Sequence, residues 1–270
     1  WNNSLFRFKV FAVALVMHSI TATAVSQSFF FRNYQVESGL SNNTVYCSAQ
    51  DSSGFLWFGT KDGVNRFDGY HFKVYNMHDE GQPLETNLIG CLLVDKNNRL
   101  WVGCQKGLYF FDRQKNRMVR FIDSLTEINA LQMDAYGRLW FITRLTICCY
   151  DFETNKLKVF PPSAYFNANS LCLSEEGQLW ACTPNGFLQR YDEASGTFES
   201  FNLFSHSPKP ASYAIIKISS AGKDALYAGT TSQGLKRFDI KRREYSDLLT
   251  LNPDKTTVYI HDIKRYNDNE

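Results

Sequence analysis

The chain has 270 residues, of which 44% are hydrophobic and 21% charged, which is enough for one large domain with a sizeable core. Its net charge of +2 comes without a basic stripe or an acidic tail, so this segment is not expected to contact nucleic acid. Aromatic residues make up 15% and prolines number 7, a balance that favours many short strands over helical bundles.

The N-terminal segment differs from the rest of the chain. Basic residues precede the apolar run from Val10 to Met17, and a small-residue segment follows in which Ala24-Val25-Ser26 suits a signal peptidase. The run is too short to span a bilayer. We therefore predict a signal peptide over residues 1–26, export to the periplasm, and a folded domain over residues 27–270. A buried N-terminal helix is the alternative.

Residues 29–43, "FFFRNYQVESGLSNN", follow the predicted signal peptide. Phe31 and Tyr34 have the spacing of Phe72 and Tyr75 in a later strand. The pattern predicts a fourth strand without a sheet of its own, of the kind that completes the last blade of a closed ring.

Five units then repeat the same pattern along the chain. They read "GFLWFGTKDGVNRFD", "NRLWVGCQKGLYFFD", "GRLWFITRLTICCYD", "GQLWACTPNGFLQRYD" and "DALYAGTTSQGLKRFD". Their aromatic anchors lie 39 to 47 residues apart and are Trp57, Trp101, Trp140, Trp180 and Tyr227. Each unit ends in an aromatic residue and an aspartate, and these aspartates are Asp68, Asp112, Asp151, Asp192 and Asp239.

Each unit alternates short strand patterns with turns. A turn such as "DSSG" precedes the anchor, and a second turn such as "TKDG" follows it. A fourth strand follows a third turn, as in "HFKVY" and "LKVF". Four antiparallel strands in about 40 residues predict one blade of a β-propeller, in which the anchors fill the space between adjacent sheets.

The C-terminal segment "TTVYIHDIKRYNDNE" begins a sixth unit but stops before its expected anchor. The predicted fold is therefore an all-β, truncated β-propeller of about five four-stranded blades and the start of a sixth, with about seven when complete.

Seven cysteines occur without a C-x-x-C pair, so the sequence supports neither a zinc site nor a redox motif. They are Cys47, Cys91, Cys104, Cys148, Cys149, Cys172 and Cys182, and we interpret them as buried small hydrophobic residues. The histidines His71, His78, His206 and His261 fall at unrelated positions of the repeat. The recurring aspartates suggest turn or cap roles, because a catalytic pair needs two unique groups. We predict no catalytic residue, metal site or cofactor.

The units resemble the two-component regulator propeller repeat. The first matches nearly throughout, from Asp51-Ser52-Ser53-Gly54 through Trp57-Phe58-Gly59-Thr60 to Arg66-Phe67-Asp68. Three departures stand out in the later units: Cys104 for threonine, Ile142 for glycine, and Tyr227 for tryptophan. The resemblance covers the chain from about Phe29 to its end.

The resemblance implies the periplasmic sensor region of a hybrid two-component histidine kinase of Bacteroidetes type. It implies signal transduction in response to a small molecule of the oligosaccharide class, by a homodimeric protein that is anchored in the inner membrane through parts downstream of this segment. This segment alone is then not an enzyme. The alternatives are an exported propeller lyase or glycan-degrading enzyme, and a protein-binding scaffold or adhesin.

Ligand-binding residues are not identified by the sequence. Irregular loops usually carry binding in such folds. The longer inserts contain Tyr165, Phe166 and Tyr213, aromatic side chains suited to stacking on a sugar but equally suited to covering blade edges.

Overall fold

The structure is a computed structural model that describes residues 31–78, 84–144, 146–160, 168–204 and 215–263. The chain divides into two units, residues 1–34 and residues 35–270. The predicted signal peptide lies outside the described residues, as do Tyr165, Phe166 and Tyr213. Residues 31–35, the described beginning of the expected extra strand, form no strand.

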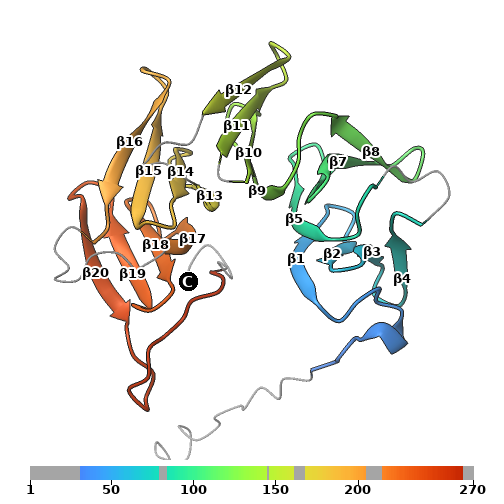
Figure 1. Cartoon of the computed structure of the whole chain (residues 1–270), viewed down its shortest axis with the longest axis horizontal. Helices are drawn as coiled ribbons and strands as arrows, with labels where there is room; N and C mark the ends of the chain where they lie inside the picture. Colours follow the sequence, from blue (N-terminus) through green and yellow to red (C-terminus); the bar gives the residue numbers. More distant parts are fainter. Residues whose placement is uncertain (1–30, 79–83, 145, 161–167, 205–214, 264–270) are drawn as a thin grey trace, which may run out of the picture. The chain divides into compact units, whose positions relative to one another are not determined.

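The main unit contains one short 3₁₀-helix, η1 (Val36–Ser38), and five four-stranded antiparallel sheets that follow one another along the chain (Figure 1). Sheet 1 consists of β1 (Val45–Gln50), β2 (Leu56–Thr60), β3 (Gly63–Phe67) and β4 (Phe72–Tyr75). Sheet 2 consists of β5 (Ile89–Val94), β6 (Leu100–Cys104), β7 (Gly107–Asp112) and β8 (Arg117–Ile122). Sheet 3 consists of β9 (Ile128–Met133), β10 (Leu139–Thr143), β11 (Thr146–Asp151) and β12 (Lys156–Phe160). Sheet 4 consists of β13 (Ser170–Leu173), β14 (Leu179–Cys182), β15 (Phe187–Asp192) and β16 (Thr197–Asn202). Sheet 5 consists of β17 (Ile215–Ser220), β18 (Ala225–Thr230), β19 (Leu235–Asp239) and β20 (Glu244–Leu249).

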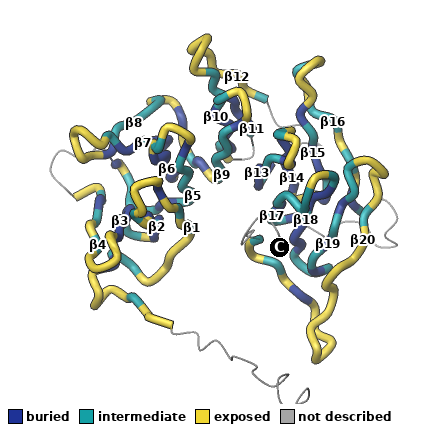
Figure 2. The backbone as a smooth tube through the Cα atoms, turned by 180° about the vertical axis from the view of Figure 1, so that it is seen from behind, coloured by how far each residue is buried: buried dark blue, intermediate teal, exposed yellow. Residues whose placement is uncertain are grey.

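Within each sheet the strands pair in sequence order. The first strands of neighbouring sheets contact one another, β1 with β5, β5 with β9, β9 with β13, and β13 with β17. Burial falls toward the fourth strands, and β12 and β20 are mostly exposed (Figure 2). These features confirm the predicted all-β propeller of four-stranded antiparallel blades.

The core lies between neighbouring sheets. Trp57, Trp101, Trp140 and Trp180 are fully buried. Trp57 contacts Phe111 of sheet 2 with ring centroids 4.9 Å apart, and Trp140 contacts Tyr191 of sheet 4 at 4.7 Å. Burying one such ring contributes about 5 kcal/mol of transfer free energy. The repeat spacing thus brings one large ring into each space between sheets.

The turn after the anchor strand is closed by a recurring side chain. The Thr60 hydroxyl donates to the carbonyl of Gly63 at 3.0 Å and accepts from the amide of Asp62 at 3.0 Å. Gly63 has φ +100°, and a Cβ there would lie 2.6 Å from the carbonyl oxygen of Tyr75. In sheet 2 the Cys104 thiol donates to the carbonyl of Gly107 at 3.3 Å, so cysteine here closes the turn as threonine does.

Ile142 replaces the glycine of the repeat because its neighbours are smaller than those of the corresponding glycines. A Cβ on Gly59 would lie 2.4 Å from Sγ of Cys47 and 2.7 Å from Cγ2 of Ile89, so these two side chains fill the space that glycine leaves. Gly103 has the same two kinds of neighbour, Cys91 and Ile128. In sheet 3 the large Ile142 pairs with Ala130 and packs in one cluster with Ala168. Large and small residues have changed places.

Candidate ligand-binding site

The first strand of four of the sheets has a β-bulge at the same position of the repeat. In β1, Val45 pairs with Thr60 and Cys47 with Gly59, which leaves Tyr46 as an extra residue. The same register shift leaves out Gly90 in β5, Asn129 in β9 and Ile216 in β17. Such bulges redirect side chains and occur often beside functional sites.

The chain after β20 continues the pattern without a sixth sheet among the described residues. The amide of Gly234 donates to the carbonyl of Val258 at 3.1 Å, as that of Gly63 donates to Asn87 before β5. A Cβ on Gly229 would lie 2.5 Å from Cγ2 of Ile260, which matches the contact between Gly59 and Ile89. Ile260 therefore takes the position of the first residue of a first strand, and His261 takes the position of the bulge.

These bulge positions meet at a cavity of about 540 Å³, called here the axial cavity. Each of the five sheets contributes to its lining, together with His261 and Asp262. The lining residues at these positions are Tyr46, Gly90, Asn129, Ile216 and His261, and Asn169 holds the equivalent position just before β13, where no bulge occurs. The next residue on each segment also lines it, and these are Cys47, Cys91, Ala130, Ser170, Lys217 and Asp262.

The axial cavity presents mostly uncharged polar groups and one ion pair. Lys217 Nζ lies 3.1 Å from Asp262 Oδ1, and both side chains are partly exposed. The Asn129 amide donates to the carbonyl of Arg144 at 3.1 Å, while its oxygen has no partner among the described residues. Tyr46 is 52% exposed. An aromatic ring beside amide groups suits a ligand with hydroxyl groups and flat apolar faces.

Several cysteines, among them Cys91 in the axial cavity, are poor nucleophiles. Burial raises the pKa of the Cys91 thiol well above its ordinary value. Burial likewise raises the pKa of Cys172 to about 12 and that of Cys149 to about 12. Such thiols stay protonated near neutral pH. No group of three metal-ligating side chains occurs in the described part of the chain.

The aspartates at the unit ends lie in exposed turns. Asp68 accepts hydrogen bonds from the amides of Tyr70 and His71 at 2.8 and 2.7 Å. Asp112 and Asp239 make the same pair of contacts with the amides two and three residues ahead. Asp151 and Asp192 each accept at least one amide in the same way. None of the five lines the axial cavity.

A second set of aspartates was not singled out by the sequence. The indole nitrogen of Trp57 donates to Asp51 at 2.9 Å, and Trp101 donates to Asp95 at the same distance. Trp140 donates to Asp134 at 2.7 Å. The sequence signal for this hydrogen bond is an aspartate six residues before the tryptophan, which the fourth unit lacks.

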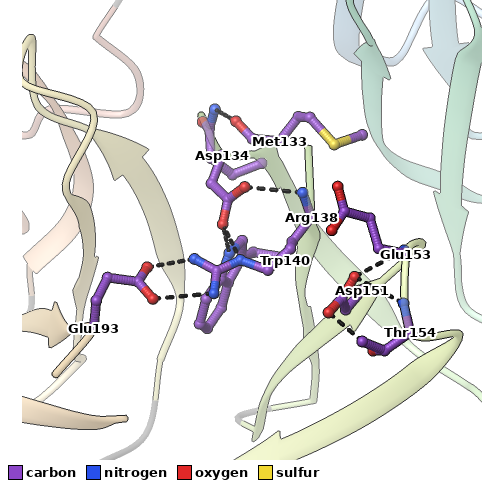
Figure 3. Close-up of polar contacts among 9 residues, drawn as sticks. Met133, Asp134, Arg138, Trp140, Asp151, Glu153, Thr154 and Glu193 are labelled. Atoms are coloured by element: carbon purple, nitrogen blue, oxygen red, sulfur yellow. Dashed lines mark hydrogen bonds and ion pairs between the residues drawn. The ribbon is translucent and has the colours of Figure 1, made fainter. Parts of the chain in front are cut away.

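Two of these aspartates also join neighbouring sheets, at junctions called seams here. Arg113, which follows the last residue of β7, donates to Asp51 of sheet 1 at 2.8 Å. In sheet 3, Arg138 Nε donates to Asp134 at 2.6 Å, while its two terminal nitrogens reach the carboxylate of Glu193, which follows β15 (Figure 3). Both seams are therefore held by buried or half-buried ion pairs.

In the described part of the chain no helix is long and apolar enough to cross a membrane. The model of the two-component regulator propeller matches residues 39–62 and 83–106. A 72-residue stretch, 26% of this chain, is 40% identical to "Histidine kinase P4" of Formosa agariphila, of which it covers 5%.

Solved structures share the fold. The extracellular domain of a putative hybrid two-component system from B. thetaiotaomicron superposes with a TM-score of 0.69 at 21% identity, over 83% of this chain and 31% of that one. A virginiamycin B lyase from Staphylococcus aureus superposes with a TM-score of 0.63 at 14% identity, over 78% of this chain and 71% of that one. The chain thus spans less than a third of the two-component structure. Residues 39–62 and 83–106 thus match the two-component regulator propeller repeat, and the five sheets share the propeller fold with these solved structures.

Proposed function

We propose that the chain is part of the extracytoplasmic sensor region of a hybrid two-component histidine kinase, and that it binds an oligosaccharide in the axial cavity. The observation that carries this proposal is the cavity lining. Anchors and turn aspartates repeat because they share one environment, whereas the six equivalent lining positions hold a tyrosine, two asparagines, a histidine, an isoleucine and a glycine. The scaffold does not need this variety, so it is available for recognition.

The proposed mechanism is a shift between two states of the sensor. A ligand that contacts several first strands at once favours the arrangement in which those strands are correctly spaced, and its differential affinity sets the signal. We place the sensor in the periplasm, as a homodimer anchored in the inner membrane. The relatives named above support this placement by resemblance.

The test uses the whole protein that carries this chain, in membrane vesicles, with neutral oligosaccharides of two to six units as probes. Autophosphorylation with labelled ATP should change with one probe and be insensitive to it after Tyr46→Ala. The exposed Tyr70, which is outside the cavity lining, provides the matched control Tyr70→Ala. Absence of any probe-dependent phosphorylation across the panel would contradict the sensor proposal.

An exported lyase is the second candidate, because virginiamycin B lyase shares the fold. Mass spectrometry of the same probes after incubation with the chain distinguishes the two. The sensor proposal expects unchanged probes, and accumulation of cleaved products would favour the enzyme.

A further inference from the structure

The seam between sheets 2 and 3 differs from the seams on either side of it. In sheets 2 and 4 the residue after the unit-ending aspartate is charged and reaches the preceding sheet: Arg113 pairs with Asp51, and Glu193 pairs with Arg138. In sheet 3 the equivalent residue is Phe152, which has no charge. The ionic contact of the seams on either side is therefore missing here, and the Phe152 ring instead packs against Trp101 and Phe121 of sheet 2.

The seam between sheets 2 and 3 contains two cationic side chains, Lys96 and Arg99, that have no acidic partner among the described residues. Arg99 lies four residues after Asp95, as Arg138 lies four residues after Asp134, and its guanidinium stacks over Trp101 and Phe110 at 5.4 Å. In the described part of the chain no carboxylate forms an ion pair with Arg99 or with the exposed Lys96. Asp95 forms an ion pair with neither cation; its oxygens accept from the Trp101 indole and from the amides of Asn97 and Arg99.

A pocket of about 280 Å³ lies at this point, called here the seam pocket. Asp95, Lys96 and Arg99 line it from sheet 2, and Met133, Tyr136 and Phe152 line it from sheet 3. Tyr136 is 67% exposed and Phe152 38% exposed. Two cations thus face apolar and aromatic side chains across a space suited to a single ring.

We propose that the seam pocket binds a carboxylate carried on a six-membered ring. The carboxylate lies between Lys96 and Arg99 and pairs with Arg99 as Glu193 pairs with Arg138 in the seam between sheets 3 and 4. Arginine suits this contact because its planar guanidinium matches the geometry of a carboxylate. The ring packs against Tyr136 and Phe152. Sugar acids and aromatic acids share this chemistry. The inference goes beyond the proposed function, because this pocket is separate from the axial cavity and its binding does not require signalling.

Binding should strengthen the contact between sheets 2 and 3, because the ligand touches both. A ligand that binds the folded state alone raises the unfolding temperature in proportion to the logarithm of its concentration. For so small a ligand in a half-open pocket, we expect a dissociation constant on the order of 1 mM. Screening by salt should weaken it.

The experiment is a thermal unfolding titration of the full chain at low ionic strength with sodium glucuronate, sodium benzoate and glucose. We expect at least one of the two carboxylates to raise the unfolding temperature, and glucose to leave it unchanged. A response to glucuronate alone identifies a sugar acid as the ligand class, and a response to benzoate alone identifies an aromatic acid. No response to either, or an equal response to glucose, would overturn the proposal.

Variants locate the effect. Lys96→Gln and Arg99→Gln should each weaken binding by about tenfold or more, whereas Lys61→Gln, which removes one exposed positive charge outside the pocket lining, should not. Both Phe152→Glu and Phe152→Gln lose the ring contacts with Trp101 and Phe121. Phe152→Glu should nevertheless have the higher unfolding temperature of the two and should not respond to the ligand, because it supplies the missing carboxylate. Equal binding by Lys96→Gln, Arg99→Gln and the parent chain would refute the site.

Discussion

The indole nitrogen of Trp180 is buried and has no hydrogen-bond partner among the described residues, and the residue six positions before it is Ser174. In the first three sheets an aspartate at that position accepts the indole hydrogen at 2.7 to 2.9 Å. A buried donor without an acceptor costs about 1–3 kcal/mol. The fourth sheet is therefore less stabilised at this point than the first three.

Ser174→Asp should restore the contact. The new carboxylate can accept a hydrogen bond from the Trp180 indole. Asp95, at the equivalent position of sheet 2, shows that a buried aspartate is tolerated there without a cation from the next sheet. We expect an increase of about 1 kcal/mol in the free energy of unfolding, which corresponds to about 2–4 °C in midpoint. Calorimetry is the measurement. Ser174→Ala, which loses the bond from the amide of Gln178, should lower the midpoint. A decrease with aspartate as large as that with alanine would refute this account.

The exchange of volume around Gly59 predicts non-additive mutations. Gly59→Ile alone should lower the free energy of unfolding by about 3 kcal/mol or more, because its side chain overlaps Cys47 and Ile89. Combining it with Cys47→Ala and Ile89→Ala reproduces the arrangement of Ile142, Ala130 and Ala168. The triple variant should lose less than the sum of the three single losses in denaturant titrations. Simple additivity would mean that these positions are not coupled.

Acid should destabilise the chain through its turn aspartates. Hydrogen bonds from the amides of His71 and Tyr70 lower the pKa of Asp68, and amide hydrogen bonds likewise lower those of Asp112 and Asp239. A lowered pKa in the folded state gives stability that is present above the unfolded value, about 3.9, and is lost as pH falls through the folded value. Unfolding free energy should therefore be steady near neutrality and fall below about pH 4.

The control for this prediction keeps the turn but removes the titration. Asparagine at positions 68, 112 and 239 still accepts amide hydrogen bonds through its side-chain oxygen. The triple Asp→Asn variant should show a shallower fall of unfolding free energy between pH 4 and pH 2, measured by denaturant titration at each pH. A slope equal to that of the parent chain would show that other groups cause the acid sensitivity.

The sequence predicted the fold because five copies repeat one pattern. A single "LWFGT" is ambiguous, whereas its recurrence with Trp101, Trp140 and Trp180 specifies sheets that bury their faces against one another. The bond between Asp51 and Trp57 was missed because it runs across a turn and follows no strand period. The axial cavity was missed because it depends on the bulge at Tyr46, and a bulge is a property of strand pairing that one strand's sequence does not reveal.

We propose that the repeats form the scaffold and that the axial cavity binds the ligand. The most direct test is calorimetric titration of the chain with the oligosaccharide that most strongly changes phosphorylation of the whole protein, comparing the parent chain, Tyr46→Ala with Asn129→Ala, and Tyr70→Ala. The account predicts that the axial double variant binds at least tenfold more weakly with an unchanged unfolding midpoint, while Tyr70→Ala binds as the parent does. Unchanged affinity in the axial double variant would contradict it.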